Sequence, residues 1–295
     1  MKQILIDENF ENGFWLYHTD GLITKEPIKT LDFNKTAKCS PSWKLAQWCS
    51  RYNLANGQEK VWDDGSFEYL DEAKSVRFWK GKGKARLSLT ASKEYTHARR
   101  EGEGWPHILI EQEFEENHFL CKIEEVVQSI DFTLTEFANM MDEKEQNDLH
   151  TVQLQWFIAI QNRNKNSKGY GDFFWFGLPF WDYPRYDFPP AFTAQDGGKE
   201  ENTGKFINIV NSREFLQKPI RLGENAVLEI PVYKWIKQGF ELAKQRNFLQ
   251  DSNWEDMCLG NMNFGFEVTG TFDVSVLINN IKIFIKKGEN DEKDD

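Results

Sequence analysis

Residues 151–161, TVQLQWFIAIQ, carry the pattern that decides the fold. Apolar side chains recur at every second position, which is the period of a β-strand with one buried face. The buried set is Val152, Leu154, Trp156, Ile158 and Ile160. The opposite set is Gln153, Gln155, Phe157, Ala159 and Gln161. The stretch therefore predicts a strand that buries one side and presents amides on the other.

Most other periodic segments repeat in the same way and are rich in β-branched or aromatic residues. The clearest are 85–90, 108–114, 206–210, 263–268 and 273–285. The segment 162–171, NRNKNSKGYG, has the composition of a turn and predicts a long hairpin between two strong strands. These segments favour a protein built mainly from strands.

Only one long stretch, VYKWIKQGFELAKQ (232–245), has helical spacing. Val232, Ile236 and Phe240 recur on one side of it, and Pro231 can occupy the first turn of a helix. A second and shorter helix is predicted for 134–141, before an acidic loop. We therefore expect one main amphipathic helix.

Many strands, one main helix and no alternating βα pattern predict an all-β fold, a two-sheet antiparallel jelly-roll sandwich. The absence of a repeat or linker predicts a single β-sandwich domain over 1–286. The charged end, 287–295, is predicted to be a disordered tail. The segment 181–204, rich in Pro, Gly, Asp and aromatics, is predicted to be a long surface loop of functional type.

The composition limits the possible partners. The chain has 295 residues, 15% of them aromatic, and a formal net charge of -11. This charge argues against nucleic acid or an anionic membrane as the main partner. It favours a neutral ligand, or an anionic one met by a local basic patch.

The four cysteines form no CxxC pair, so they are expected to be reduced and mostly buried, and no cofactor or metal motif is seen. No segment has the length of a membrane span, and the start MKQILIDENF lacks a signal-peptide core. The protein is predicted to be soluble and cytoplasmic as written, or secreted if a signal has been removed. The oligomeric state does not follow from the sequence.

Two segments resemble known proteins. The run GNMNFGFEVTGTFDVSVLINNIKIFI (260–285) resembles the closing strands of concanavalin A-like lectin and glucanase-type β jelly rolls. The opening ILIDENFENGFWLY (4–17) resembles the start of bacterial carbohydrate-binding sandwiches. The resemblance implies a carbohydrate ligand on a concave sheet that carries rings, amides and carboxylates. Sugars suit such a surface, because their C–H faces stack on rings and their hydroxyls pair with amides and carboxylates.

The stretch EQEFE (111–115) alternates acids along one strand. Successive acids would lie about 6.5–7 Å apart, which permits either retaining or inverting glycoside hydrolysis. The pattern resembles the acid-x-acid-x-acid strand of laminarinase- and lichenase-type jelly rolls, with Glu113 in place of the middle Asp. This resemblance implies Glu111 as nucleophile and Glu115 as acid/base, with Glu113 tuning them. The alternative is an ordinary solvated strand face.

Two further groups are candidate catalytic residues. Glu267 shares a predicted strand face with Asn263 and Gly265, and glucanase-like jelly rolls can carry a catalytic Glu at a similar place. Its alternative is a carboxylate satisfied by an Arg or a backbone N–H. His150 begins a predicted strand and could act as a general base, or it could cap a turn.

The segment WDYPRYDFPP (181–190) adds Asp182, Arg185 and Tyr186 as candidate substrate-binding residues. Arg185 could hold a carboxylate or sulfate on a sugar. Tyr with His and Arg could instead carry out β-elimination, as in jelly-roll polysaccharide lyases. A structural calcium ion near Asp7, Glu8 or Asp273 is suggested by related sandwiches, although no calcium loop is present.

Three hypotheses follow: a glycoside hydrolase or polysaccharide lyase, a non-catalytic glycan-binding module, and a protein-interaction module. The first needs titratable groups that face one another, whereas the second needs only rings and amides. The remaining predicted substrate-binding residues are Trp105, His107, Gln153, Gln155 and Trp175.

Overall fold

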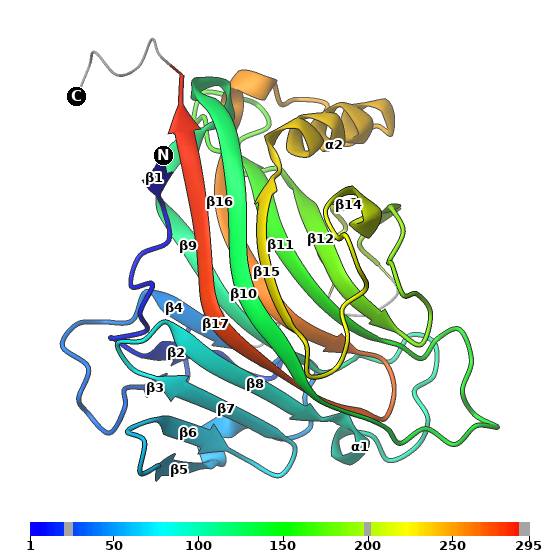
Figure 1. The fold of residues 1–295 in the computed structure, drawn as a ribbon. Coiled ribbons are helices and arrows are strands. Elements are labelled where there is room, and N and C mark those ends of the chain that lie inside the picture. The colour runs from blue at the N-terminus through cyan, green and yellow to red at the C-terminus, as the bar shows by residue number, and fades with distance from the viewer. Residues whose placement is uncertain (21–25, 198–201, 289–295) are drawn as a thin grey trace.

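A computed structural model describes residues 1–20, 26–197 and 202–288. The described chain forms two sheets that face each other (Figure 1). This confirms the predicted all-β, two-sheet sandwich of jelly-roll type. Almost all strand pairs are antiparallel; β12–β14 and β2–β4 are parallel.

One sheet has eight strands. In order across the sheet, seven of them are β15 (Asn225–Pro231), β10 (Ile123–Asn139), β17 (Phe272–Lys287), β8 (Lys84–Thr90), β7 (Lys74–Trp79), β6 (Phe67–Leu70) and β5 (Gln58–Val61). The short strand β1 (Lys2–Gln3) also pairs with β17.

The other sheet has nine strands. They are β13 (Phe192–Gln195), β14 (Phe206–Ile209), β12 (Phe173–Tyr183), β11 (Val152–Asn162), β16 (Met257–Val268), β9 (His107–Phe119), β4 (Trp43–Ala46), β2 (Phe14–Leu16) and β3 (Lys29–Leu31). The quoted stretch forms β11, at the centre of this sheet.

Helices are few in the described residues. The α-helices are α1 (Ala91–Glu94) and α2 (Tyr233–Gln245), and the 3₁₀ turns are η1 (Leu54–Asn56), η2 (Leu120–Lys122), η3 (Ser212–Glu214) and η4 (Trp254–Asp256). α2 confirms the predicted main helix, although Pro231 is the last residue of β15 and not part of the helix. No helix in the described ranges is long and apolar enough to span a membrane.

The hydrophobic core lies between the sheets. The predicted stripe of β11, from Val152 to Ile160, is fully buried there. The Trp156 ring meets Phe264 of β16 edge-on, and Phe264 in turn contacts Phe132 of β10 from the facing sheet. Because these rings come from both sheets, their burial holds the layers together.

Several sequence predictions are wrong. The cysteines are not mostly buried, because Cys258 alone of the four is buried. The segment 134–141 is not a helix. Its residues up to Asn139 form the end of strand β10, which pairs with β17. A register shift between Leu134 and Glu136 interrupts the period of two, so that apolar residues recur at spacing that resembles a helix. The segment 181–204 is not loop throughout, because β12 extends to Tyr183 and β13 occupies 192–195.

Two predictions concern the chain's turns and end. The predicted hairpin is confirmed, since the backbone N–H of Gly171 donates to the carbonyl of Asn162 at 2.8 Å and the segment joins β11 to β12. Lys287, the first residue of the predicted tail, belongs to β17. Residues 289–295 of that tail lie outside the described residues.

Candidate functional site

The side of the nine-stranded sheet that faces away from the eight-stranded sheet, called the outer face below, collects polar groups from its central strands. Strand register places Glu267 of β16 opposite Gln153 of β11, and Gln153 opposite Asp182 of β12. On the other side of β16, His107 lies opposite Glu267, and Glu111 lies opposite Asn263. Segments far apart in the sequence thus meet on one surface.

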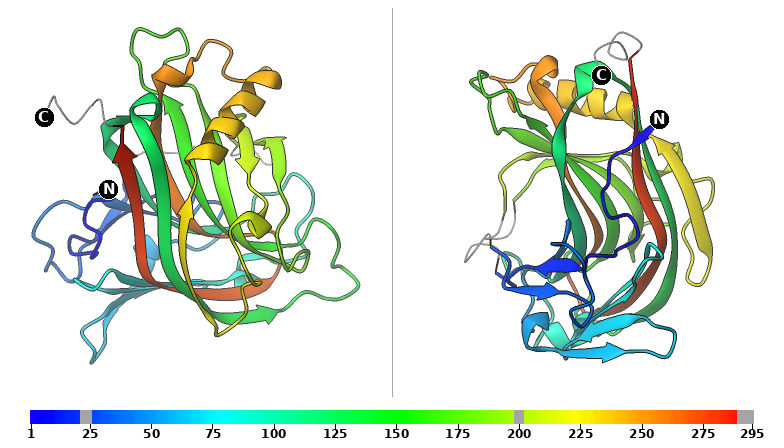
Figure 2. Two further views of the ribbon diagram at one scale, coloured as in Figure 1. Left: turned by 45° about the horizontal axis from the view of Figure 1, so that its top comes forward. Right: turned by 90° about the vertical axis from the view of Figure 1, so that its left-hand side faces the viewer.

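The outer face is more enclosed than the solvated face of an ordinary sheet. The exposed fractions are 2% for His107, 6% for Gln155, 7% for Asn263 and 7% for Asp182. The sheet curves, and the outer face lies on the inner side of the bend (Figure 2). Polar side chains buried to this extent must find partners, so their hydrogen bonds define the chemistry of the face.

Three side chains form a hydrogen-bonded relay across β11 and β12. Gln155 Nε2 donates to Gln153 Oε1 at 2.7 Å, and Gln153 Nε2 donates to Asp182 Oδ2 at 2.9 Å. The other oxygen of Asp182 accepts from the Thr151 hydroxyl. A carboxylate can only accept, so it fixes the orientation of Gln153, and Gln153 then fixes that of Gln155. The Oε1 atom of Gln155 is enclosed and accepts no hydrogen bond from the residues that the structure describes.

Glu267 lies in a cluster with Trp105 and His107. Trp105 Nε1 donates to Glu267 Oε2 at 3.2 Å, and His107 Nε2 lies 3.4 Å from the same oxygen. His107 Nδ1 lies 2.7 Å from the carbonyl oxygen of Trp105, which can only accept, so Nδ1 must carry a proton. The other ring nitrogen, Nε2, is the atom that faces the Glu267 carboxyl.

Glu111 has a different environment. It is part-buried on β9, and among the described residues its carboxyl accepts no hydrogen bond. Burial is the largest influence and raises the pKa of Glu111 to about 8; Lys44 opposes the rise and Glu113 adds to it. The Lys44 ammonium pairs directly with Glu113 instead. Glu111 is therefore largely protonated at neutral pH.

We expect Glu111→Gln to stabilise the protein at pH 9 by about 1–2 kcal/mol, with little effect at pH 5. The folded state holds a proton on Glu111 that the unfolded state releases near its ordinary pKa of 4.5, so Glu111 makes stability fall as pH rises from 4.5 to about 8. Urea unfolding at both pH values measures the effect. The exposed Glu115→Gln is the control, and an equal gain at pH 5 and pH 9 would contradict the assignment.

The spacing of the carboxylates limits their possible joint roles. Glu111 pairs with Asn263, four residues along β16 from Glu267, so the two acids are about 13 Å apart. The position opposite Glu267 on β11, at the close spacing that a retaining pair requires, is an amide, Gln153. Asp182 lies on β12, the strand beyond β11 from Glu267. The backbones of Asp182 and Glu267 are therefore about 9.5 Å apart, which is close to the carboxyl separation of inverting pairs.

The remaining predicted site residues are spread more widely. Trp175 lies on the outer face beside Phe157, with ring centroids 6.1 Å apart, and its indole donates to Thr203. Arg185 and Tyr186 lie in an exposed turn after β12, where the Tyr186 backbone N–H donates to the Asp182 carbonyl. Glu113 and Glu115 are solvent-exposed on β9.

His150 is fully buried, and both ring nitrogens are engaged. Nδ1 accepts from the backbone N–H of Asn147 at 3.2 Å, and Nε2 donates to the carbonyl of Arg99 at 3.0 Å. This arrangement favours a structural role for His150, and its predicted role as a base stays a prediction without support from this geometry.

Sequence reasoning missed some of the polar groups at this site. Thr151 donates to Asp182 and immediately precedes β11, so its place beside the predicted strand could have indicated it. Arg99, whose guanidinium lies over the Trp105 ring, is in a loop without periodicity, so no sequence pattern indicated it.

No metal-binding cluster of His, Cys, Asp or Glu occurs in the ranges that the structure describes. The residues suggested for calcium have other partners: Asp7 accepts from the backbone of Glu11 and Asn12, and Asp273 accepts from Ser92. The calcium ion stays a prediction.

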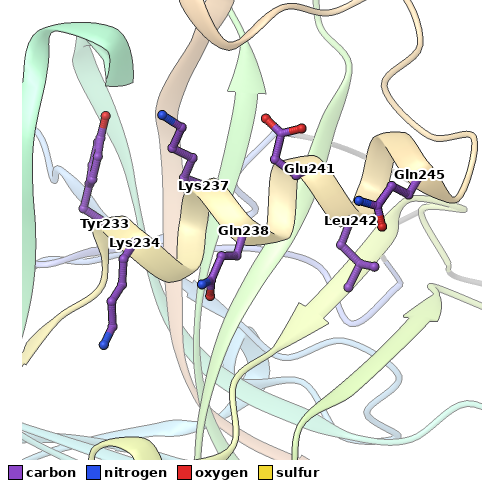
Figure 3. A pocket seen from close by; sticks show the side chains of 7 residues that line it. All are labelled: Tyr233, Lys234, Lys237, Gln238, Glu241, Leu242 and Gln245. Carbon is purple, nitrogen blue, oxygen red and sulfur yellow. The ribbon is translucent and has the colours of Figure 1, made fainter.

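A hollow lies along α2 (Figure 3). Tyr233, Lys237 and Glu241 project to one side of the helix, whereas Lys234 and Gln238 project to the other. Because these side chains do not converge on a common point, the hollow offers no candidate site.

Comparison with known proteins gives structural likeness only. No protein-family model and no curated protein sequence matches the chain. Similar solved structures include an endoglucanase from Rhodothermus marinus, with 8% identity, 79% of this chain and 97% of that chain covered, and a TM-score of 0.41. A family 11 xylanase from Neocallimastix patriciarum has 9% identity, coverage of 80% and 98%, and a TM-score of 0.41.

A family 12 xyloglucanase from Bacillus licheniformis has 9% identity, coverage of 78% and 97%, and a TM-score of 0.43. At these identities and scores we draw nothing about function from the three likenesses.

Proposed function

We propose that the protein binds a carbohydrate on the outer face of the nine-stranded sheet. The observation that carries the proposal is the relay from Gln155 through Gln153 to Asp182, which holds two amides in fixed orientations on an enclosed sheet face. Oriented amides and carboxylates recognise hydroxyl groups, because each sugar hydroxyl both donates and accepts. The unpaired Oε1 of Gln155 is an acceptor that a small local movement would offer to a ligand.

Rings beside the relay supply the second requirement for a sugar. Trp175 and Phe157 lie at one side of it, and Trp105 lies at the Glu267 end. Gly177 lies beneath Phe157, where a Cβ atom would come within 2.5 Å of that ring. Rings next to amides match the two sides of a pyranose, one apolar and one polar.

The binding proposal is tested with Trp175→Ala and Gln153→Ala. Each is expected to weaken binding of the tightest ligand among cellohexaose, xylohexaose, laminarihexaose and hexagalacturonate at least tenfold in calorimetric titration. Tyr170→Ala, which removes a 54% exposed ring from the β11–β12 hairpin, is the control. Failure of all four glycans to bind at millimolar concentration, or an equal loss in the control, would sink the proposal.

A second candidate function is hydrolysis with inversion, and the contact between His107 and Glu267 favours it. Glu267 would give its proton to the glycosidic oxygen as the bond to the anomeric carbon breaks. Asp182 would take a proton from the water that attacks that carbon from the opposite side. The geometry offers less to a lyase, because His150 is enclosed and Tyr186 is exposed at the turn.

A further inference from the structure

Arg99 is a buried arginine that has no carboxylate partner among the described residues. Only 5% of its surface is exposed. Its Nε donates to the carbonyl of Glu103 at 2.9 Å, and its guanidinium lies over the Trp105 ring, 4.8 Å from the centroid. Among the described residues, no hydrogen-bond acceptor or acidic side chain pairs with Nη1 or Nη2.

The two terminal amino groups of Arg99 are not fully enclosed. Among the described residues, the wholly enclosed side-chain atoms that lack a partner do not include Nη1 or Nη2 of Arg99, so each keeps some contact with solvent. The Nε–H bond and the contact with the Trp105 ring therefore hold the side chain, while the four terminal N–H donors have no partner among the described residues. A buried charge is costly to leave unpaired, and an anion that reaches these donors would remove that cost.

The position of Arg99 connects it to the outer face. Trp105, on which it lies, donates to Glu267, and the Trp105 and His107 rings are stacked at 21°. Tyr95 links the same loop to β16, since its hydroxyl donates to the Val268 carbonyl at 2.8 Å. A ligand that lies over Glu267 and Gln153 would thus place its next substituent near Arg99.

We propose that Arg99 receives an acidic substituent, a carboxylate or a sulfate ester, on the glycan that the outer face binds. This inference rests on the proposed function and names the class of ligand as an acidic carbohydrate. The planar guanidinium offers two parallel donors to either oxyanion while its face stays on Trp105. In a chain with a formal net charge of -11, this supplies the local positive site that an anionic ligand requires.

The test uses monosaccharides, so that it does not depend on the glycan's linkage. Glucuronate, glucose 6-sulfate and glucose are titrated into ¹⁵N-labelled protein at constant ionic strength. The Arg99 Nε–H and Trp105 Nε1–H signals report binding at the cluster. The acidic sugars are expected to shift both signals and to bind at least fivefold more tightly than glucose, and the tighter of the two identifies carboxylate or sulfate.

Variants separate a receptor role from a structural one. Arg99→Gln is expected to weaken the acidic sugar at least tenfold and to leave glucose unchanged. Arg99→Lys, which keeps the charge but loses the planar fork, is expected to weaken it at least threefold. The exposed neighbour Arg100→Gln is the matched control and is expected to have no effect.

Three outcomes would count against the inference. Equal affinity for glucose and both acidic sugars overturns it and leaves the proposed function standing. If the sugars shift the Trp105 signal of the unaltered protein but not the Arg99 signal, the inference is also overturned and the proposed function stands. This result does not depend on whether the variants fold. Binding of none of the three sugars, here and in the hexasaccharide titrations, overturns both proposals.

Discussion

Replacing Gly265 with alanine is expected to lower the melting temperature by roughly 6–10 °C, corresponding to about 3 kcal/mol of folding free energy. A Cβ atom at this position would lie 2.1 Å from the backbone oxygen of Ile108 on β9, and the residue's φ of 153° disfavours a side chain. Backbone cannot move aside as a flexible side chain can, so β9 and β16 must separate locally.

The same change is expected to damage the outer face, since Asn263 and Glu267 flank Gly265 on that side of β16. Calorimetry and glycan titration on one sample measure both effects. Gly197→Ala is the control, because its Cβ would meet nothing closer than 3.8 Å. A melting temperature within 2 °C of that of the unaltered protein would show that the β9–β16 pairing differs from the one described.

The second large effect is expected from Glu267→Gln. In the hydrolysis proposal, this change should reduce the rate by about 10²- to 10⁴-fold and alter glycan affinity less than threefold. Glutamine keeps the shape and can accept from Trp105, but it cannot transfer a proton to a leaving oxygen. Asp182→Asn should reduce the rate by a similar factor, because an amide does not take a proton from water.

Product release is followed by NMR, which also reports the anomer that forms first. Inversion is expected from the separation of Glu267 and Asp182. Glu115→Gln serves as the control, since Glu115 is exposed on β9, and a loss there would support the acid-x-acid-x-acid interpretation instead. An unaltered protein that binds the hexasaccharides without cleaving them would remove the hydrolysis proposal and leave binding in place.

Parts of the fold could be read from local pattern because side-chain alternation is a local property. The stripe of β11 and the spacing in α2 each follow from which neighbours are apolar. The prediction failed at 134–141 because a register shift depends on the partner strand β17, which no local window contains. It also placed Pro231 in the helix, whereas pairing with Val127 keeps that residue in β15.

The sequence by itself determined that this protein is a β-sandwich and which side chains of each strand share a face. Only the tertiary structure decided which strands are neighbours. Register between distant segments places Glu267 beside Gln153 and His107, and far from Glu111, although the acids of 111–115 have the more conspicuous pattern. Packing of a loop against Trp105 likewise buried Arg99. Distances between side chains depend on pairing across the chain, and spacing along it cannot supply them.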